Sequence, residues 1–192
     1  MKAVLWLRAE AHADVHRREA LLSAARDAIE AAVLGRSPRP VVAEATPTLL
    51  RHAASFVTLR KLDGALRGCI GELEAHRPLI DSVRACAVGA ALRDPRFPPV
   101  TRDELEAVRI GISVLTTPEE VRAPAGIEVG RHGLLVQRGE RRGVLLPEVA
   151  PEQGWDTDAF LAQTCRKAGL PAEAWRDLGT RVSVFETIKL AE

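Results

Sequence analysis

The segment of residues 55–71, SFVTLRKLDGALRGCIG, constrains the fold of this chain most strongly. It contains two strand-like runs separated by the dipeptide Asp63-Gly64. This dipeptide is typical of a two-residue type I′ turn, because both central positions of that turn need a positive φ angle. The segment therefore predicts a β-hairpin, whose two strands must be antiparallel.

Pairing the strands outward from a two-residue turn gives the hairpin two different faces. Mostly apolar side chains share one face: Val57, Leu59, Leu66 and Ile70. Polar side chains share the other face: Thr58, Arg60, Arg67 and Cys69. Both strands give the same sorting, which supports the register. Gly68 and Gly71 predict either a close approach of another group to the backbone or a β-bulge, and a bulge would change the alternation of faces.

The rest of the chain alternates irregularly between helical and strand patterns. Helices are predicted over 17–34, from near residue 78 to before Pro95, and over 157–168, the last with Asp156 as its N-cap. Strands are predicted over 107–115, as a pair within 132–147, and over 181–190. Several of these strands are linked as hairpins, which indicates an α+β fold with packed helices on a mainly antiparallel sheet.

Length and charge limit the classes of protein that this chain can belong to. The 192 residues fit a single domain over residues 17–192, with two sub-lobes as an option, and leave residues 1–16 as an unassigned N-terminal extension. A net charge of +1 makes a nucleic acid an unexpected partner. No membrane span, metal site or cofactor motif is found. The three cysteines include no C-x-x-C pair, so a reduced, cytoplasmic location is expected.

A set of short motifs resembles the AMMECR-type domain family, in the order of that family. The motifs are FVTL (56–59), LRGCIG (66–71), DPRFPP (94–99), SVL (113–115), GRHGL (130–134), LLP (145–147), QGW (153–155) and CRKAGLP (165–171). The resemblance spans residues 18–190. It implies two unequal lobes around a cleft, with LRGCIG near the cleft. It also implies partnership with Memo-like and radical-SAM proteins, as component A of the AmmeMemoRadiSam set.

Cys69 is the candidate nucleophile of the chain. A thiol reacts as its thiolate, which a nearby guanidinium such as Arg67 would favour. His132 is a candidate base, since Cys–His pairing activates many thiols. The alternative is that Cys69 only lines a site or packs in the core, because free cysteines are commonly buried. Cys86 and Cys165 lie on the inner stripes of predicted helices and are expected in the core.

Arg60 and Arg67, opposite each other in the predicted register, need a negative group between them. A bound anion could fill that place, as could an internal carboxylate from Glu44, Glu72 or Asp94. Arg96 is suited to a bidentate contact with a carboxylate or a phosphate. The predicted ligand-binding residues are Thr58, Arg67, Gly68, Gly71, Asp94 and Arg96.

Two functions follow from these residues. The first is a binding or accessory module for a small anionic ligand or a protein partner, acting with Memo-like and radical-SAM proteins in a modification pathway. The second is a cysteine-dependent enzyme with Cys69 as nucleophile and His132 as base, in which Arg67 or backbone amides stabilise an oxyanion.

Overall fold

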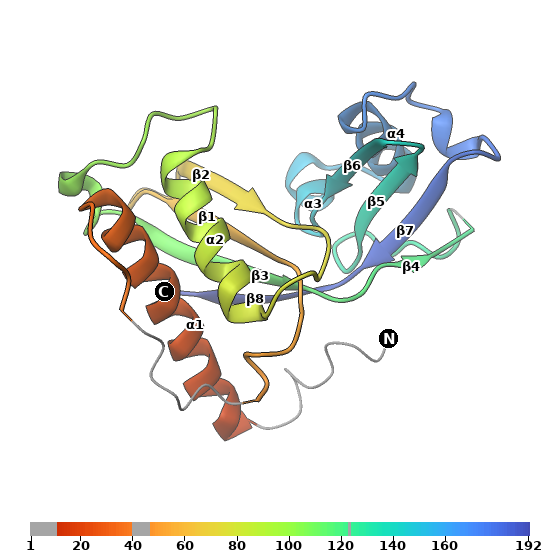
Figure 1. Cartoon of the computed structure of the whole chain (residues 1–192). Helices are drawn as coiled ribbons and strands as arrows, with labels where there is room; N and C mark the ends of the chain where they lie inside the picture. The colour runs from red at the N-terminus through yellow and green to blue at the C-terminus, as the bar shows by residue number, and fades with distance from the viewer. Residues whose placement is uncertain (1–10, 40–46, 123) are drawn as a thin grey trace. The chain divides into compact units, whose positions relative to one another are not determined.

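The computed structural model describes residues 11–39, 47–122 and 124–192, with side chains from Val15 onward. The chain divides into two compact units (Figure 1). The first unit holds the described residues up to Leu115 together with residues 188–192, and the second unit holds residues 116–187. Among the described helices, none combines the length and hydrophobicity that a membrane span requires.

The first unit places two helices on one four-stranded sheet (Figure 1). The sheet has the strand order β2-β1-β3-β8, so β2 is an edge strand. The elements are α1 (Ala11–Val33), β1 (Ser55–Arg60), β2 (Leu66–Gly71), α2 (Leu79–Leu92), the 3-10 helix η2 (Arg102–Glu104), β3 (Arg109–Leu115) and β8 (Thr187–Ala191).

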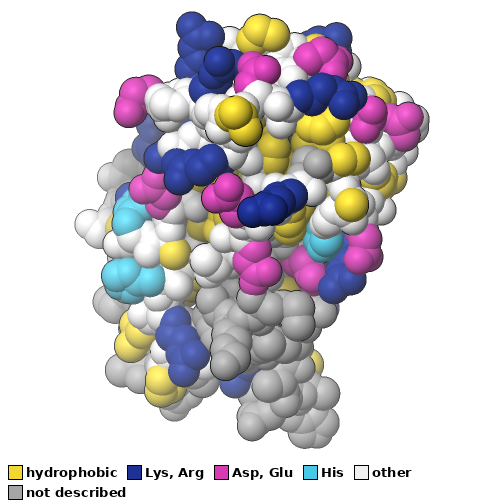
Figure 2. Space-filling model, turned by 90° about the vertical axis from the view of Figure 1, so that its right-hand side faces the viewer, with side chains coloured by type: hydrophobic (Ala, Val, Ile, Leu, Met, Phe, Trp, Pro, Cys, Tyr) yellow, Lys and Arg dark blue, Asp and Glu magenta, His cyan; other side chains and the backbone are white. Residues whose placement is uncertain are grey.

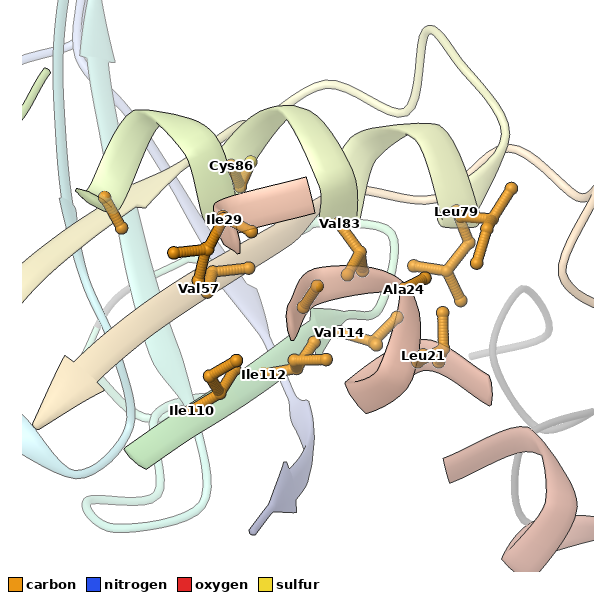
Figure 3. Packing of buried hydrophobic residues seen from close by; sticks show 14 of the residues in the cluster. Leu21, Ala24, Ile29, Val57, Leu79, Val83, Cys86, Ile110, Ile112 and Val114 are labelled. Carbon is orange, nitrogen blue, oxygen red and sulfur yellow. The ribbon is translucent and has the colours of Figure 1, made fainter. Parts of the chain in front are cut away.

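The core of the first unit lies between its helices and the sheet (Figure 3). Leu21 and Ile29 of α1 meet Val83 of α2 and the aliphatic residues of β1 and β3. All three side chains are fully buried. Burying each of them contributes about 1.5–3 kcal/mol to the free energy of folding before entropy losses are counted. This packing defines an inner face of the sheet, turned toward the helices, and an outer face turned away from them.

The second unit has its own sheet and its own core. The sheet order is β4-β7-β5-β6, and α4 contributes the fully buried Phe160, Leu161 and Cys165. The elements are β4 (Glu119–Glu120), β5 (Gly133–Arg138), β6 (Arg141–Leu145), α3 (Val149–Gln153), α4 (Thr157–Lys167), the 3-10 helix η3 (Ala174–Arg176) and β7 (Arg181–Phe185). The Asp156 carboxylate accepts the backbone N–H of Ala159 at 2.8 Å, which confirms the predicted N-cap.

The predicted α+β class with antiparallel pairing is confirmed, while two element boundaries differ from the prediction. Helix α1 begins at Ala11, before the predicted start at Arg17, and from Val15 onward its first fully buried residue is Leu21. The predicted single strand 181–190 is two strands, β7 and β8, in different sheets. The cleft that the resemblance implies stays a prediction, as does the domain boundary at residue 16.

The hairpin turn has three residues rather than two. The backbone N–H of Gly64 bonds to the carbonyl of Lys61 at 2.9 Å, and Gly64 alone takes a positive φ, of 86°. Asp63 keeps a negative φ, so the turn is a type I turn followed by a left-handed glycine. The longer turn shifts the pairing by one residue, and Arg60 therefore lies opposite Leu66.

A β-bulge then restores the predicted register farther along the hairpin. The pairing shifts between Leu59 and Arg60, which leaves Arg67 as the extra residue of β2. Beyond the bulge, Thr58 lies opposite Cys69 and Val57 opposite Ile70, as predicted. The predicted opposition of Arg60 and Arg67 is wrong, because a bulged residue has no direct partner on the other strand.

The two glycines of LRGCIG accommodate close neighbours of the sheet. A Cβ atom on Gly68 would lie 2.1 Å from the backbone oxygen of Ala90 in α2. A Cβ atom on Gly71 would lie 2.1 Å from the ring of Phe56. Glycine at position 68 therefore lets α2 approach β2 closely, and glycine at position 71 lets the aromatic ring lie on the strand.

We expect the substitution Gly68→Ala to lower the free energy of unfolding by about 2 kcal/mol, because the helix backbone cannot yield easily to the added methyl group. Urea denaturation measures this change. The matched control is Gly111→Ala in β3, where the nearest atom to an added Cβ lies at 3.8 Å and the change should stay within about 0.5 kcal/mol. Equal losses in the two variants would contradict the close approach of α2.

Candidate functional site

Cys69 presents its thiol on the outer face of the first unit's sheet. Its sulfur lies 3.3 Å from Oγ1 of Thr58, directly across the strand pair, and either group can donate the hydrogen bond. Cys69 is partly exposed, whereas Cys86 and Cys165 are buried as predicted. Burial raises the pKa of the Cys86 and Cys165 thiols. Cys69 is thus the only one of the three thiols within reach of a ligand.

The backbone of Cys69 is tied to the segment that follows α2. Its N–H donates to Oδ2 of Asp94 at 2.8 Å, and its carbonyl accepts from Nη2 of Arg96 at 3.3 Å. These groups point away from β1, toward the open edge of β2, so Thr58 and Cys69 form a non-hydrogen-bonded pair. Side chains of such pairs lie close together, which explains the contact between the hydroxyl and the thiol.

Asp94 is a buried carboxylate with several donors. Its side chain is 2% exposed, and it accepts from Nε and Nη2 of Arg96 at 2.9 and 2.7 Å. The hydrogen bonds from Arg96, and next the backbone N–H of Cys69, hold the pKa of Asp94 well below its usual range. Asp94 therefore stays ionised and fixes both Cys69 and Arg96.

Arg67 points from the bulge toward η2 and pairs with Glu104. Nε and Nη2 of Arg67 donate to the two carboxylate oxygens at 2.8 and 2.9 Å, and the arginine side chain is 5% exposed. The hydrogen bonds from Arg67, and next the backbone N–H of Thr101, lower the pKa of Glu104 from 4.5 to about 2. Glu104 was not predicted as a site residue. The spacing Thr101-x-x-Glu104 signals a capping box, which is present, but it does not signal the pairing with Arg67.

Two of the three carboxylates considered for Arg67 pair with other arginines. Asp94 holds Arg96, and Glu72 binds Arg77 with a nitrogen–oxygen distance of 3.0 Å. Glu44 lies outside the described residues. The expectation of an internal carboxylate is therefore correct for Arg67, but its partner is Glu104.

His132 lies in the second unit, and Cys69 lies in the first. Its Nδ1 accepts the backbone N–H of Glu128 at 3.1 Å, which places the proton of the neutral ring on Nε2. The pairing of His132 with Cys69 stays a prediction. No group of three His, Cys, Asp or Glu side chains among the described residues is arranged to hold a metal ion.

Charges of both signs are mixed on the surface in view in Figure 2. Basic and acidic side chains alternate there, and neither sign covers a continuous area of the described atoms. This face offers no broad basic surface of the kind that binds nucleic-acid phosphates.

We expect Glu104→Gln to lower the free energy of unfolding by about 2 kcal/mol at neutral pH, since a charged acceptor of hydrogen bonds is lost. A carboxylate whose pKa is lower in the folded state than in the unfolded state stabilises the protein when the pH is above the unfolded-state pKa. This stabilisation is lost as the pH falls through the folded-state pKa. The difference between wild type and variant should therefore shrink between about pH 5 and pH 2. Urea denaturation across this range, with exposed Glu106→Gln as control, measures it. A difference that stays constant with pH would contradict the ion pair.

Comparison with known proteins finds relatives that match most of the chain. A protein of Methanothermobacter thermautotrophicus is 46% identical over 172 residues, covering 86% of this chain and 89% of the relative. A protein of Thermococcus gammatolerans is 44% identical over 177 residues, covering 87% of this chain and 86% of the relative.

A solved structure supports the fold. The crystal structure of an uncharacterised protein from Pyrococcus horikoshii superposes with a TM-score of 0.85 at 39% sequence identity, covering 91% of this chain and 90% of that protein. The family model described as AMMECR1 matches residues 22–190. The mixed fold, the relatives and the family match agree, and the chain belongs to the AMMECR1 family.

Proposed function

We propose that this protein is a binding module whose site is the outer face of the first unit's sheet around Thr58 and Cys69. The module takes a small anionic ligand or a segment of a protein partner, and it serves as an accessory to Memo-like and radical-SAM proteins in a modification pathway. The family context supports the choice of partners, and the geometry around Cys69 supports a binding role.

One observation carries the proposal: Cys69 is immobilised through its backbone while its side chain remains partly exposed. Asp94 binds its N–H and Arg96 binds its carbonyl. A ligand that reaches the thiol meets a surface already fixed in place, and it loses less entropy on binding than it would on a mobile loop.

The charges around Cys69 favour binding over nucleophilic catalysis. The guanidiniums of Arg67 and Arg96 are each paired with a carboxylate, so neither adds an uncompensated positive charge for a thiolate. Among the described residues, the hydrogen-bond partner of the sulfur is the hydroxyl of Thr58, which is not a base at neutral pH.

The predicted ligand-binding residues divide into two groups by exposure. Arg96 is 54% exposed and can contact a ligand while it holds Asp94. Asp94 and Arg67, at 2% and 5% exposed, act as positioning residues for Cys69 and for η2. Gly68 and Gly71 are explained by their packing, and a direct contact of either glycine with the ligand stays a prediction.

The test is protection of Cys69 from alkylation by a partner. We expect N-ethylmaleimide to modify Cys69 alone in the folded protein, with Cys86 and Cys165 as internal buried controls. Adding a Memo-like protein from the same organism should slow the modification about tenfold or more, because a bound partner covers the thiol. Mass spectrometry after timed quenching gives the rates.

A matched pair of variants separates the site from the general surface. Thr58→Val should weaken the complex in calorimetric titrations, while Ser183→Ala, on the sheet of the second unit, should not. Unchanged alkylation of Cys69 in the presence of the partner, together with equal affinities of the two variants, would rule out this site.

The second candidate function is a cysteine-dependent enzyme. It is favoured by the partial exposure of Cys69, since the other two cysteines are buried. A resting nucleophile is already a thiolate, so its alkylation rate should stay level between about pH 5.5 and pH 7.5. A binding residue without thiolate character should react about tenfold faster for each pH unit over this range. A level profile would favour the enzyme, and a rate that rises tenfold for each pH unit would count against it.

A further inference from the structure

A hollow of about 400 Å³ lies between α1 and the segment that leads into β3. Small-molecule sites in proteins commonly enclose about 300–1,000 Å³, so this volume suits a small ligand. The hollow belongs to the first unit and shares no residue with the surface around Thr58 and Cys69. Two arginines, three glutamates and one leucine line it: Arg26, Glu30, Leu105, Glu106, Arg109 and Glu192.

Arg26 and Glu192 form a fixed, charge-balanced wall of the hollow. Nη1 and Nη2 of Arg26 donate to the carbonyls of Leu105 and Val108 at 2.8 and 2.9 Å. Arg26 also forms an ion pair with Glu192, whose Oε2 accepts the backbone N–H of Ile110 at 3.0 Å. These contacts tie α1 to the segment before β3, and the opposite charges of the pair compensate each other.

Glu106 and Arg109 border the same hollow and are not paired with each other. Both residues are exposed, and neither has an ion-pair partner in the part of the chain that the structure describes. Nη1 of Arg109 donates to the carbonyls of Glu106 and Val108 at 3.1 and 3.5 Å, so the guanidinium lies over the main chain. The Nε–Nη2 edge of Arg109 therefore keeps its two donors for a ligand. Arg67 uses the same edge to hold a carboxylate.

We infer that this hollow binds a free α-amino acid with an aliphatic side chain. The ligand carboxylate accepts from Nε and Nη2 of Arg109, because these two N–H groups match the two oxygens of a carboxylate. The ligand ammonium donates to the carboxylate of Glu106. Leu105 is partly buried and is the apolar residue of the lining, and it contacts the aliphatic side chain. This site is independent of the proposed function.

The charges of the lining favour a ligand that carries both signs. An anion alone would lie beside the carboxylates of Glu30 and Glu106, and a cation alone would lie beside the guanidinium of Arg109. A metal ion is also a poor match, since the described residues offer no group of three side chains arranged to hold one. A zwitterion satisfies the free cation and the free anion at the same time.

L-leucine is the first probe of the hollow. We expect a saturable titration in ¹⁵N–¹H spectra of the full chain, with the largest shifts at the backbone amides of Leu105, Glu106 and Arg109. Isocaproate and isoamylamine have the same side chain as leucine, but each carries only one of its two charges. Each should bind at least about fivefold more weakly than leucine, because one charge-assisted hydrogen bond is lost.

Two variants assign the two charges of the ligand separately. Arg109→Gln should weaken leucine at least about fivefold and leave isoamylamine, which has no carboxylate, unchanged. Glu106→Gln should weaken leucine to a similar extent and leave isocaproate, which has no ammonium, unchanged. A purely structural role of either residue would weaken all three probes together. The matched controls are Arg181→Gln and Glu140→Gln, exposed residues of the second unit, and both should bind leucine as the wild type does.

Three results would overturn the inference. The first is the absence of saturable shifts with leucine. The second is equal binding of leucine and the two singly charged probes. The third is a loss of leucine binding in the Arg181 or Glu140 controls that matches the loss in Arg109→Gln. Protection of Cys69 by a partner does not enter any of these measurements, so this site and the proposed function are tested separately.

Discussion

The hydrogen bond from the backbone N–H of Cys69 to the buried carboxylate of Asp94 is the contact on which the outer face of the sheet depends. It occupies a backbone N–H at the open edge of β2, which could otherwise pair with a strand of another chain. Arg96 compensates the buried charge and also binds the Cys69 carbonyl, so one short segment after α2 closes the middle of β2. Removing Asp94 would leave a buried N–H and an unpaired guanidinium at the same point.

The β-bulge at Arg67 lets the hexapeptide LRGCIG connect to a second segment of the first unit. With the observed turn, a regular strand would have placed Arg67 opposite Leu59, on the apolar inner face of the sheet. The bulge directs Arg67 to Glu104 on η2, and the resulting ion pair attaches the segment after α2 to the strand at a second point. Bulges commonly redirect a side chain near functional sites, and this one turns Arg67 to its carboxylate partner.

The arginines on and beside this sheet therefore belong to two classes. Those paired with carboxylates, Arg67 and Arg96, hold elements in place. Arg60 and Arg109 are exposed and donate to backbone carbonyls of nearby residues.

Local patterns in the sequence determined the α+β class, the hairpin at 55–71 and the N-cap at Asp156, because alternation and capping depend on residues close together in the chain. The motifs also sufficed to identify the family. Only the tertiary structure decided the three-residue turn, the bulge, and the choice of Glu104 for Arg67 and of Arg109 for Arg60. The Arg67–Glu104 and Arg60–Arg109 pairings join residues 37 and 49 positions apart. The order of strands in a sheet and the path of a loop set them, and no local pattern encodes either.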